Sequence, residues 1–398
     1  MKFPSFRRLG LCFVLAVAMP AVSAQDASTL GSPSHETARE EKHAAFKDPQ
    51  DGGFDISEWL LDRRGFLPVP IVITEPAVGY GGGVALAFFR KPKVPARTAS
   101  DGKIHPIAPD IYGAAAMKTE NGSEAAGVGA SLHFAEDRWR YRGGAAKASF
   151  NLDFYTAGAL LEPRRIGYNI DGLMSFQQVF RRLGEQDLYL GLSWIYMDLD
   201  TRLDLQSDRD FFTDKELSQR SSGLGVSLEY DTRDNPFTPS RGWLGMVDAT
   251  FYDSAFGSDN KFQGYRGHAF GYLPMFEERL IVGGRIDARA VDGDVPFYRL
   301  PYIDLRGIPS ARYQDRRVAM LETELRWNLT GRWALIGFLG AGRAWGKRDS
   351  FGDAASQVAK GAGFRYLLAK KLGLYSGLDY AWGPEDETFY IQIGSAWR

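Results

Sequence analysis

Short segments in which apolar residues alternate with polar or small ones follow one another from Phe66 to the end of the chain. In the last segment, Phe389, Ile391, Ile393 and Trp397 fall on one face, because neighbouring side chains of a strand point to opposite sides. Many such strands with no long apolar helix between them are typical of a transmembrane barrel. We therefore predict an all-β fold, a transmembrane antiparallel β-barrel of about 16 strands, in the outer membrane of a Gram-negative bacterium, with these four residues as a terminal assembly signal.

The alternation gives an even number of strands only if the first apolar stretch is divided at Glu75 and Pro76. An even number of strands places both the start of the first strand and the end of the last strand in the periplasm. The connections then tend to alternate between short periplasmic turns and long extracellular loops, except for a long periplasmic connection from Lys91 to Pro109. The predicted strands span residues 66–75, 79–90, 110–119, 124–135, 138–151, 165–180, 187–200, 218–232, 242–255, 260–274, 278–291, 317–329, 332–345, 356–369, 372–382 and 388–398.

Residues 1–24 have the parts of a secretory signal peptide: a basic start, an apolar run too short to span a bilayer, and small residues before a cleavage site after Ala24. Cleavage removes the only cysteine, Cys12, so we expect no disulfide in the mature protein. The formal net charge of -1 gives no basic surface for nucleic acid. A charged fraction of 24% is compatible with a barrel, because only one face of each strand meets lipid.

Residues 25–65 are expected to form a periplasmic linker and a short amphipathic helix, and residues 66–398 the barrel. The helix is predicted from Asp55 as N-cap, with Ile56, Trp59 and Leu60 at helical spacing. Such a helix can rest on the periplasmic rim or plug the lumen, and resting on the rim is the more common arrangement.

Charged side chains in the middle of strands are expected to face the lumen, since they are costly against lipid. In the segment 317–329 this rule sends Glu322, Glu324 and Arg326 inward and Leu321, Leu325 and Trp327 outward. It also sends inward Arg285, Asp287, Arg289, Asp248, Glu229 and Asp379. A hydrated salt-bridge network explains such residues better than a paired-carboxylate enzyme site. The histidines have no metal or catalytic spacing, so we predict no catalytic residue, no metal and no cofactor.

Two stretches resemble motifs of the BamA/TamA superfamily of outer-membrane assembly and translocation barrels. Leu305-Arg306-Gly307 resembles the Val-Arg-Gly-aromatic motif of the sixth extracellular loop, although Ile308 stands where an aromatic residue is common. The segment with Phe338, Gly340 and Gly342 is similar to the Phe-x-Asp-x-Gly wall segment, with Gly340 in place of Asp. The resemblance implies a loop latch, in which the loop folds into the barrel and Arg306 meets Glu324, with Glu322 as a second carboxylate.

The stretch from Tyr230 to Gly242 is similar to a periplasmic turn of bacterial surface antigen barrels, with Asp231, Asp234 and Gly242 as its motif residues. The resemblance covers the whole barrel. Residues 25–64 leave no room for a POTRA domain, which suggests the POTRA-less branch of the superfamily.

The resemblance implies a function in membrane-protein insertion or polypeptide translocation by opening between the first and last strands. The expected partners are outer-membrane lipid and lipopolysaccharide, unfolded outer-membrane polypeptides, and the barrel assembly machinery for the chain's own insertion. Glycines near both ends of the barrel, such as Gly83 and Gly377, could weaken its closing seam or serve curvature alone. The alternative is a passive channel or receptor whose folded loop narrows the pore. An outer-membrane enzyme is disfavoured because no catalytic triad is found.

Overall fold

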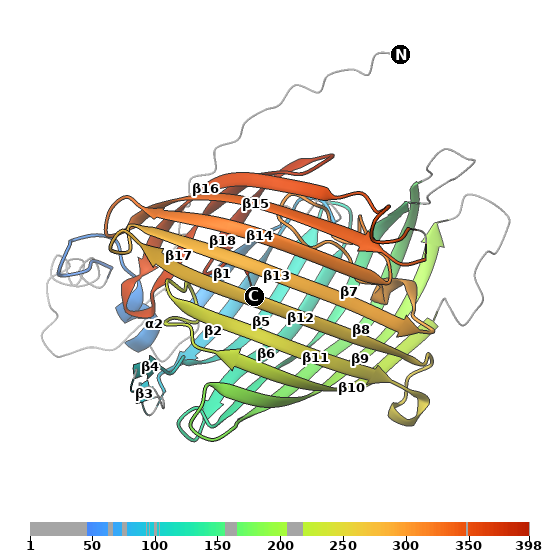
Figure 1. Cartoon of the computed structure of the whole chain (residues 1–398), viewed down its shortest axis with the longest axis horizontal. Coiled ribbons are helices and arrows are strands. Elements are labelled where there is room, and N and C mark those ends of the chain that lie inside the picture. The colour runs from blue at the N-terminus through green and yellow to red at the C-terminus, as the bar shows by residue number, and fades with distance from the viewer. Residues whose placement is uncertain are drawn as a thin grey trace, which may run out of the picture. The chain divides into compact units, whose positions relative to one another are not determined.

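The computed structural model describes residues 46–62, 67–73, 78–92, 94, 96–98, 102, 104–155, 165–204, 218–347 and 349–397. The predicted signal peptide and the first part of the predicted linker lie outside these residues. Sixteen strands form one antiparallel sheet in chain order, rolled into a nearly closed barrel with β1 and β18 as its first and last strands (Figure 1). Within the described ranges, no helix has the length and apolar character needed to cross a bilayer.

All sixteen predicted strands are present. β7 and β9 are longer than predicted, because their pairing with β8 continues as far as Tyr155 and Asp204, beyond the roughly 9–11 residues that a membrane strand needs. The strands are β1 (Leu67–Ile73), β2 (Gly81–Arg90), β5 (Asp110–Thr119), β6 (Glu124–Phe134), β7 (Trp139–Tyr155), β8 (Arg165–Arg182), β9 (Leu188–Asp204), β10 (Ser218–Asp231), β11 (Gly242–Tyr252), β12 (Phe262–Met275), β13 (Leu280–Gly293), β14 (Arg317–Asn328), β15 (Trp333–Trp345), β16 (Gln357–Ala369), β17 (Leu374–Trp382) and β18 (Glu387–Ile393).

Short elements decorate the barrel. The predicted amphipathic helix is present as α2 (Ser57–Asp62). The long connection after β2 contains a small hairpin, β3 (Ala96–Thr98) paired with β4 (Ile104–Pro106). In Figure 1, α2 and this hairpin lie at the same end of the barrel, the predicted periplasmic rim. Three short 3-10 helices are η1 (Ser254–Phe256), η2 (Phe297–Arg299) and η3 (Lys370–Leu372).

The predicted assignment of inner and outer faces is confirmed in β14. Leu321 and Trp327 are 59% and 55% exposed and point outward, whereas Glu322 is 3% exposed and points inward. The predicted lumenal salt-bridge network is also present. Asp287, for example, is fully buried and lies 2.8 Å from Arg266 and 2.9 Å from Arg289. The pleat of each strand therefore separates an apolar outer surface from a charged interior.

The terminal strand is shorter than predicted, and one of its predicted residues lies elsewhere. β18 ends at Ile393, and Gly394 then adopts a left-handed backbone conformation, with φ of 80°. This turn takes the chain into the barrel, where Trp397 is 3% exposed and packs with Phe270 and Tyr272. The prediction that Trp397 shares the lipid-facing side of Phe389 is therefore wrong, because the alternation of a strand does not continue through a left-handed residue.

The remaining face assignment of β18 makes a testable prediction. Phe389 is 39% exposed on the outer surface, and Asp at this position places a charge against lipid, which costs free energy according to its depth. We expect Phe389→Asp to reduce the fraction of heat-modifiable, folded barrel more than Gln392→Asp, whose side chain belongs to the inner face. Equal folded fractions for the two variants would show that the face assignment of β18 is inverted.

Candidate functional site

The long loop between β13 and β14 folds back into the barrel. Ile303, Leu305 and Ile308 are each less than 5% exposed and pack against Val318 and Met320 of β14. An aliphatic residue at position 308 therefore suits this fold, because its side chain is part of an apolar cluster. This apolar packing holds the loop against β14 in addition to any ion pair.

The two wall glycines make room for this loop. A Cβ atom on Gly340 would lie 2.9 Å from Cδ2 of Leu305, and one on Gly342 would lie 2.8 Å from Cγ2 of Ile303. Such distances are too short for carbon atoms in contact. Gly340, where the resembling motif commonly has Asp, is thus the residue that lets Leu305 approach the wall of β15.

Arg306 carries the predicted loop latch. Its Nε and Nη2 atoms donate hydrogen bonds of 3.0 and 2.7 Å to Oε1 of Glu322, and its Nη2 atom lies 2.8 Å from Oε2 of Glu324. Nη1 donates a hydrogen bond of 2.8 Å to Asp379 of β17. Both predicted carboxylates are therefore partners of Arg306. Asp379 was predicted to face the lumen, but its place in the latch was missed, because nothing in the sequence relates residues on such distant strands.

The guanidinium of Arg306 is buried among three carboxylates and one aromatic ring. The guanidinium of Arg306 lies 3.6 Å from the ring centroid of Phe338, so the predicted wall motif receives the arginine through its aromatic ring. Burial disfavours the charge of Arg306, but Glu324, Glu322 and Asp379 together raise its pKa. Charge-assisted hydrogen bonds in such a partly desolvated site are stronger than those on a surface.

The glycine of the loop motif lets the backbone reach the wall. Gly307 has φ of 91°, and its backbone N–H donates a hydrogen bond of 2.9 Å to the hydroxyl of Tyr390 in β18. A Cβ atom at Gly307 would lie 3.0 Å from the nitrogen of Gly383, so a larger residue has no space there. The loop tip thereby touches both β17 and β18, the last two strands of the barrel.

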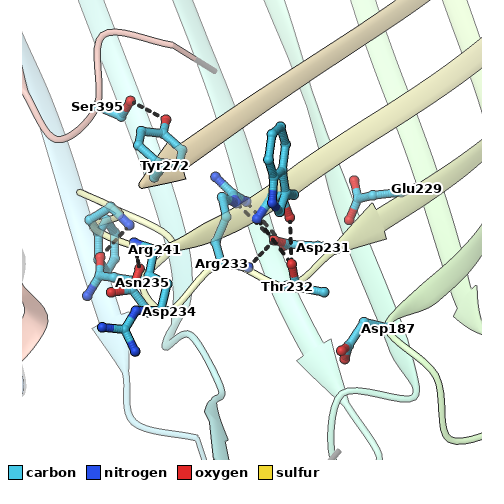
Figure 2. A network of polar contacts seen from close by, with 12 residues as sticks. Asp187, Glu229, Asp231, Thr232, Arg233, Asp234, Asn235, Arg241, Tyr272 and Ser395 are labelled. Atoms are coloured by element: carbon cyan, nitrogen blue, oxygen red, sulfur yellow. Dashed lines mark hydrogen bonds and ion pairs between the residues drawn. The ribbon is translucent and has the colours of Figure 1, made fainter. Parts of the chain in front are cut away.

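The predicted motif turn between β10 and β11 is closed by its own carboxylates (Figure 2). Asp231 accepts hydrogen bonds from the guanidinium of Arg233, at 2.9 Å from Nε and 3.1 Å from Nη2. Asp234 accepts from the backbone N–H groups of Ser240 and Arg241. Gly242 is left-handed, with φ of 97°. The residues singled out in the sequence therefore define the conformation of this turn.

The motif turn also holds the end of the chain. The side-chain amide of Asn235 donates a hydrogen bond of 2.8 Å to the carbonyl of Leu372, in the connection between β16 and β17. The carbonyl of Phe237 accepts from the backbone N–H of Ser395 at 2.6 Å. Figure 2 shows Ser395 also bonded to Tyr272, with the two hydroxyl oxygens 3.2 Å apart. Residues 394–397 form what we call the tail, and these bonds keep it inside the rim.

The tail and the loop latch share one carboxylate. The indole N–H of Trp397 donates a hydrogen bond of 2.7 Å to Oε2 of Glu322, while Oε1 of the same residue receives Arg306. A loop arginine, a wall motif and a characteristic rim turn therefore occur together in a sixteen-stranded barrel.

Comparison with known sequences identifies this combination. The family description "Omp85 superfamily domain" matches residues 125–397, more than half of the chain. The chain belongs to the Omp85 superfamily. No curated protein sequence matches it.

Solved structures agree in fold. BamA from Haemophilus ducreyi lacking POTRA domains 1-3 is 13% identical with a TM-score of 0.53, over 83% of this chain and 70% of that chain. CdiB from Escherichia coli is 12% identical with a TM-score of 0.56, over 82% of this chain and 62% of that chain. CdiB from Acinetobacter baumannii is 12% identical with a TM-score of 0.53, over 83% and 59%. The Omp85 chain thus spans less than two thirds of either CdiB chain. At identities of 12–13%, the likeness to these structures shows the fold alone.

This Omp85 barrel carries a further structured segment at one rim, of which the sequence predicted only the helix α2. We call residues 46–62 the strap. Arg332, in the turn between β14 and β15, lies 2.7, 2.8 and 2.9 Å from oxygens of Asp48, Asp51 and Asp55. It also donates to the carbonyl oxygens of Phe54 and Leu367. One guanidinium thus joins three carboxylates of the strap to the barrel.

The helix of the strap contacts both sides of the seam between β1 and β18. Leu60 is 5% exposed and packs against Leu372 and Leu374, next to the last strands. Phe89 of β2 and Ile393 of β18 pack against the same cluster. The predicted position of α2 on the rim agrees with these contacts.

We expect Arg332→Gln to release the strap. Loss of three ion pairs leaves Asp48, Asp51 and Asp55 without their shared partner, so trypsin should cleave after Lys47 at least about tenfold faster. Arg343→Gln is the matched control, because Arg343 lies at the other end of β15 and donates to Ser356 and Phe351. Equal cleavage rates in both variants would contradict the role of Arg332.

The strap should resist mild acid. The hydrogen bond from Arg332 lowers the pKa of Asp51 from 3.8 to about 2, and the hydrogen bond from Lys370 lowers that of Asp48. A lowered folded pKa contributes stability above the ordinary value of the group and loses it as pH falls through the folded value. Cleavage within the strap by pepsin, a protease that is active in acid, should therefore stay slow at pH 5 and become faster between about pH 4 and 2.

The hairpin β3–β4 reaches a second part of the same rim. Arg97 is 9% exposed, pairs with Asp187 and lies 3.6 Å from Asp137. Asp137 also binds Arg140, at 2.7 Å from both Nε and Nη2.

Among the residues that the structure describes, no group of histidine, cysteine or carboxylate side chains could hold a metal ion.

Proposed function

We propose that this Omp85 barrel assists the insertion of outer-membrane proteins, or translocates polypeptides, by opening between β1 and β18. The observation that carries the proposal is the loop latch. Arg306, held by Glu322, Glu324 and Asp379, joins the long loop to β14 and β17, and Gly307 joins it to β18 through Tyr390. A loop bonded to the last strands can hold one side of a seam in place while the other side moves.

Glycines beside the seam support the same proposal. A Cβ atom on Gly83 of β2 would collide with the carbonyl oxygen of Ala116, and one on Gly377 of β17 with that of Phe364. These glycines permit close backbone approach and strong bending next to β1 and β18. Curvature at these positions lowers the free energy needed to separate the terminal strands.

The proposal also covers the processing, the location and the partners of the chain. We propose that residues 1–24 are cleaved as a signal peptide, that residues 25–65 lie in the periplasm, and that residues 66–398 enter the outer membrane with the help of the barrel assembly machinery. The outer surface then meets lipid and lipopolysaccharide. The clients are unfolded outer-membrane polypeptides, and the proposal involves no catalytic step, cofactor or nucleic acid.

Reconstitution tests this function. The full chain in liposomes should accelerate the folding of an added urea-unfolded outer-membrane barrel, measured as its heat-modifiable fraction over time, relative to empty liposomes. Arg306→Ala should reduce the acceleration. Arg316→Ala should not, because Arg316 of the same loop pairs with Asp292 and donates to the carbonyl of Gly293, and so does not join the loop to β17 or β18. No acceleration, together with large and steady conductance in planar bilayers, would favour the passive channel or receptor instead.

A further inference from the structure

Charged side chains are unevenly distributed over the inner face of the barrel. Arg140 and Arg142 of β7 pair with Glu229 inside the lumen, so Gly144 and Ala146, two and four residues further along the strand, lie on the inner face as well. Residues that pair across neighbouring strands share a face. The registers therefore extend this assignment from β7 to its neighbours, and there they define a wall without any charged or polar side chain.

Three neighbouring lines of paired residues form this apolar wall, and every residue in them is Gly, Ala, Val, Leu, Ile, Met or Phe. Across the strands between them, the lines join Val69 to Met197, Ile71 to Leu199, and Ala87 to Ile195. The wall covers β1, β2 and β5 to β9 in strand order. It measures about 29 Å by 13 Å, since neighbouring strands lie about 4.8 Å apart and each residue advances about 3.3 Å.

The apolar wall is open to the lumen. Phe176 pairs with Gly144 and Ile195, so its ring points inward, and yet it is 41% exposed. Gly144 pairs in turn with Gly129, and these two glycines have no side chains to cover the ring. Phe180, on the same face of β8, is fully buried. The interior of a water-filled barrel is usually polar, and an exposed apolar patch of this size usually marks a binding site.

The wall suits a lipid better than a polypeptide. Its strands are hydrogen-bonded to one another, so this face offers no backbone partner to a bound chain. A polypeptide backbone laid on the wall would leave N–H and C=O groups unpaired, whereas an acyl chain has no such groups. Met174 and Met197 lie side by side in the middle line, and their flexible side chains can adapt to apolar chains of different shapes.

Two cations border the wall. The side chain of Arg142, two residues before Gly144, is 34% exposed, whereas that of its partner Glu229, 2.6 Å away, is 1% exposed. The lumen therefore meets the guanidinium rather than the carboxylate. Nη1 of Arg299 in the long loop lies 3.6 Å from the sulfur of Met197, and its Nε atom is buried without a hydrogen-bond partner among the described residues. A phosphate would complement such guanidinium groups.

We propose that the lumen binds an anionic lipid, with its acyl chains on the apolar wall and its phosphate at Arg142. In strand order the middle of the wall lies opposite β13 to β16, where the inner face carries Arg285, Glu322 and Glu324. The lumen thus has one apolar and one charged side, which matches the two parts of a lipid. This activity is additional to the proposed function and does not depend on it.

Spin labels at two neighbouring positions test what covers the wall. Ala146 faces the lumen and Ala145 faces lipid, so Cys12→Ser with either Ala146→Cys or Ala145→Cys gives a matched pair in phosphatidylglycerol liposomes. If lipid covers the wall, oxygen should reach both labels and a water-soluble nickel chelate should reach neither. Access of the chelate to position 146 alone would show a water-filled lumen and overturn the proposal. A label at 146 that neither reagent reaches would show a covering protein segment, which would also overturn it.

A photoreactive lipid tests the position of the acyl chains. The probe is phosphatidylglycerol with a diazirine in one acyl chain, added to liposomes that contain the full chain. It should label Met174 and Phe176 on the inner face as well as Leu173, which is 48% exposed on the outer face. Labelling confined to the outer face of a normally heat-modifiable barrel would overturn the site.

The same probe tests the head group. Arg142→Gln should lower the labelling of Met174 and Phe176 about tenfold, because a charge-assisted contact with the phosphate is lost, and should leave that of Leu173 unchanged. Glu229 keeps Arg140 at 2.9 Å in this variant.

Arg266→Gln is the matched control. The side chain of Arg266 is 31% exposed and pairs with the fully buried Asp287, but Arg266 lies on β12, outside the wall. It should therefore leave the inner labelling unchanged. Equal loss in Arg142→Gln and Arg266→Gln, or no loss in either, would overturn the placement of the phosphate at Arg142.

Discussion

Replacement of Arg306 by alanine should lower the free energy of unfolding by about 3–5 kcal/mol, the usual cost of breaking a buried ion pair by removing one partner. Glu322 and Glu324 would then lie in the lumen without their main cation, while Asp379 keeps Arg365 at 2.6 and 2.8 Å. The temperature at which the barrel loses heat-modifiable migration should fall. Proteolysis between Asp292 and Arg316 should become faster, since the loop loses its strongest attachment.

A double-mutant cycle separates the contact from general damage. Glu322→Gln alone also breaks the pair, so the combined variant Arg306→Ala/Glu322→Gln should be less destabilised than the sum of the two single variants. Arg306→Lys should rescue only part of the loss, because an ammonium cannot bond to Glu322, Glu324 and Asp379 in the geometry of a guanidinium. Strict additivity, with unchanged loop proteolysis, would mean that Arg306 is not held in the lumen.

Replacement of Trp397 by alanine should be almost as costly, at about 3–5 kcal/mol, because it empties the space of a large buried aromatic side chain. The indole packs between Phe270 and Tyr272, with ring centroids 6.1 and 5.9 Å away. A Cβ atom on Gly283 would lie 2.9 Å from the indole ring, so the wall is shaped around it. Urea-dependent loss of folded barrel measures this effect.

Trp397→Phe distinguishes packing from hydrogen bonding. It keeps an aromatic ring but removes the donor to Glu322, so it should cost much less than Trp397→Ala. If Trp397 instead faced lipid, Trp397→Ala would change stability little, and an aspartate at this position would be about as harmful as one at Phe389. That result would restore the original strand prediction for the end of the chain.

The strands could be predicted because lipid on one side and a charged lumen on the other impose a period of two on every strand. β14 illustrates this, with Leu321 outside and Glu322 inside. The error at Trp397 has a local cause. Gly394 offers a left-handed turn that a pattern of apolar residues does not register, and the fragment Ser395-Ala396-Trp397 fits a strand and a tail equally well.

The candidate site was predictable in part. Arg306 and its two glutamates were inferred by resemblance, and both glutamates lie at the arginine. Asp379 and Arg332 were not, because their partners are separated from them by long stretches of sequence. The contact between Arg332 and Asp48 joins the first described segment to the connection between β14 and β15, and no periodicity relates such positions.

The two oxygens of Glu322 join the long loop to the tail. One oxygen receives Arg306 of the loop between β13 and β14, and the other receives Trp397 of the tail. If a ligand that binds the long loop weakens the binding of a second ligand to the tail, thermodynamic linkage requires that the second ligand weaken the binding of the first by the same factor. A ligand that binds the tail should therefore change the exposure of the long loop, and an antibody against that loop should alter the release of the tail.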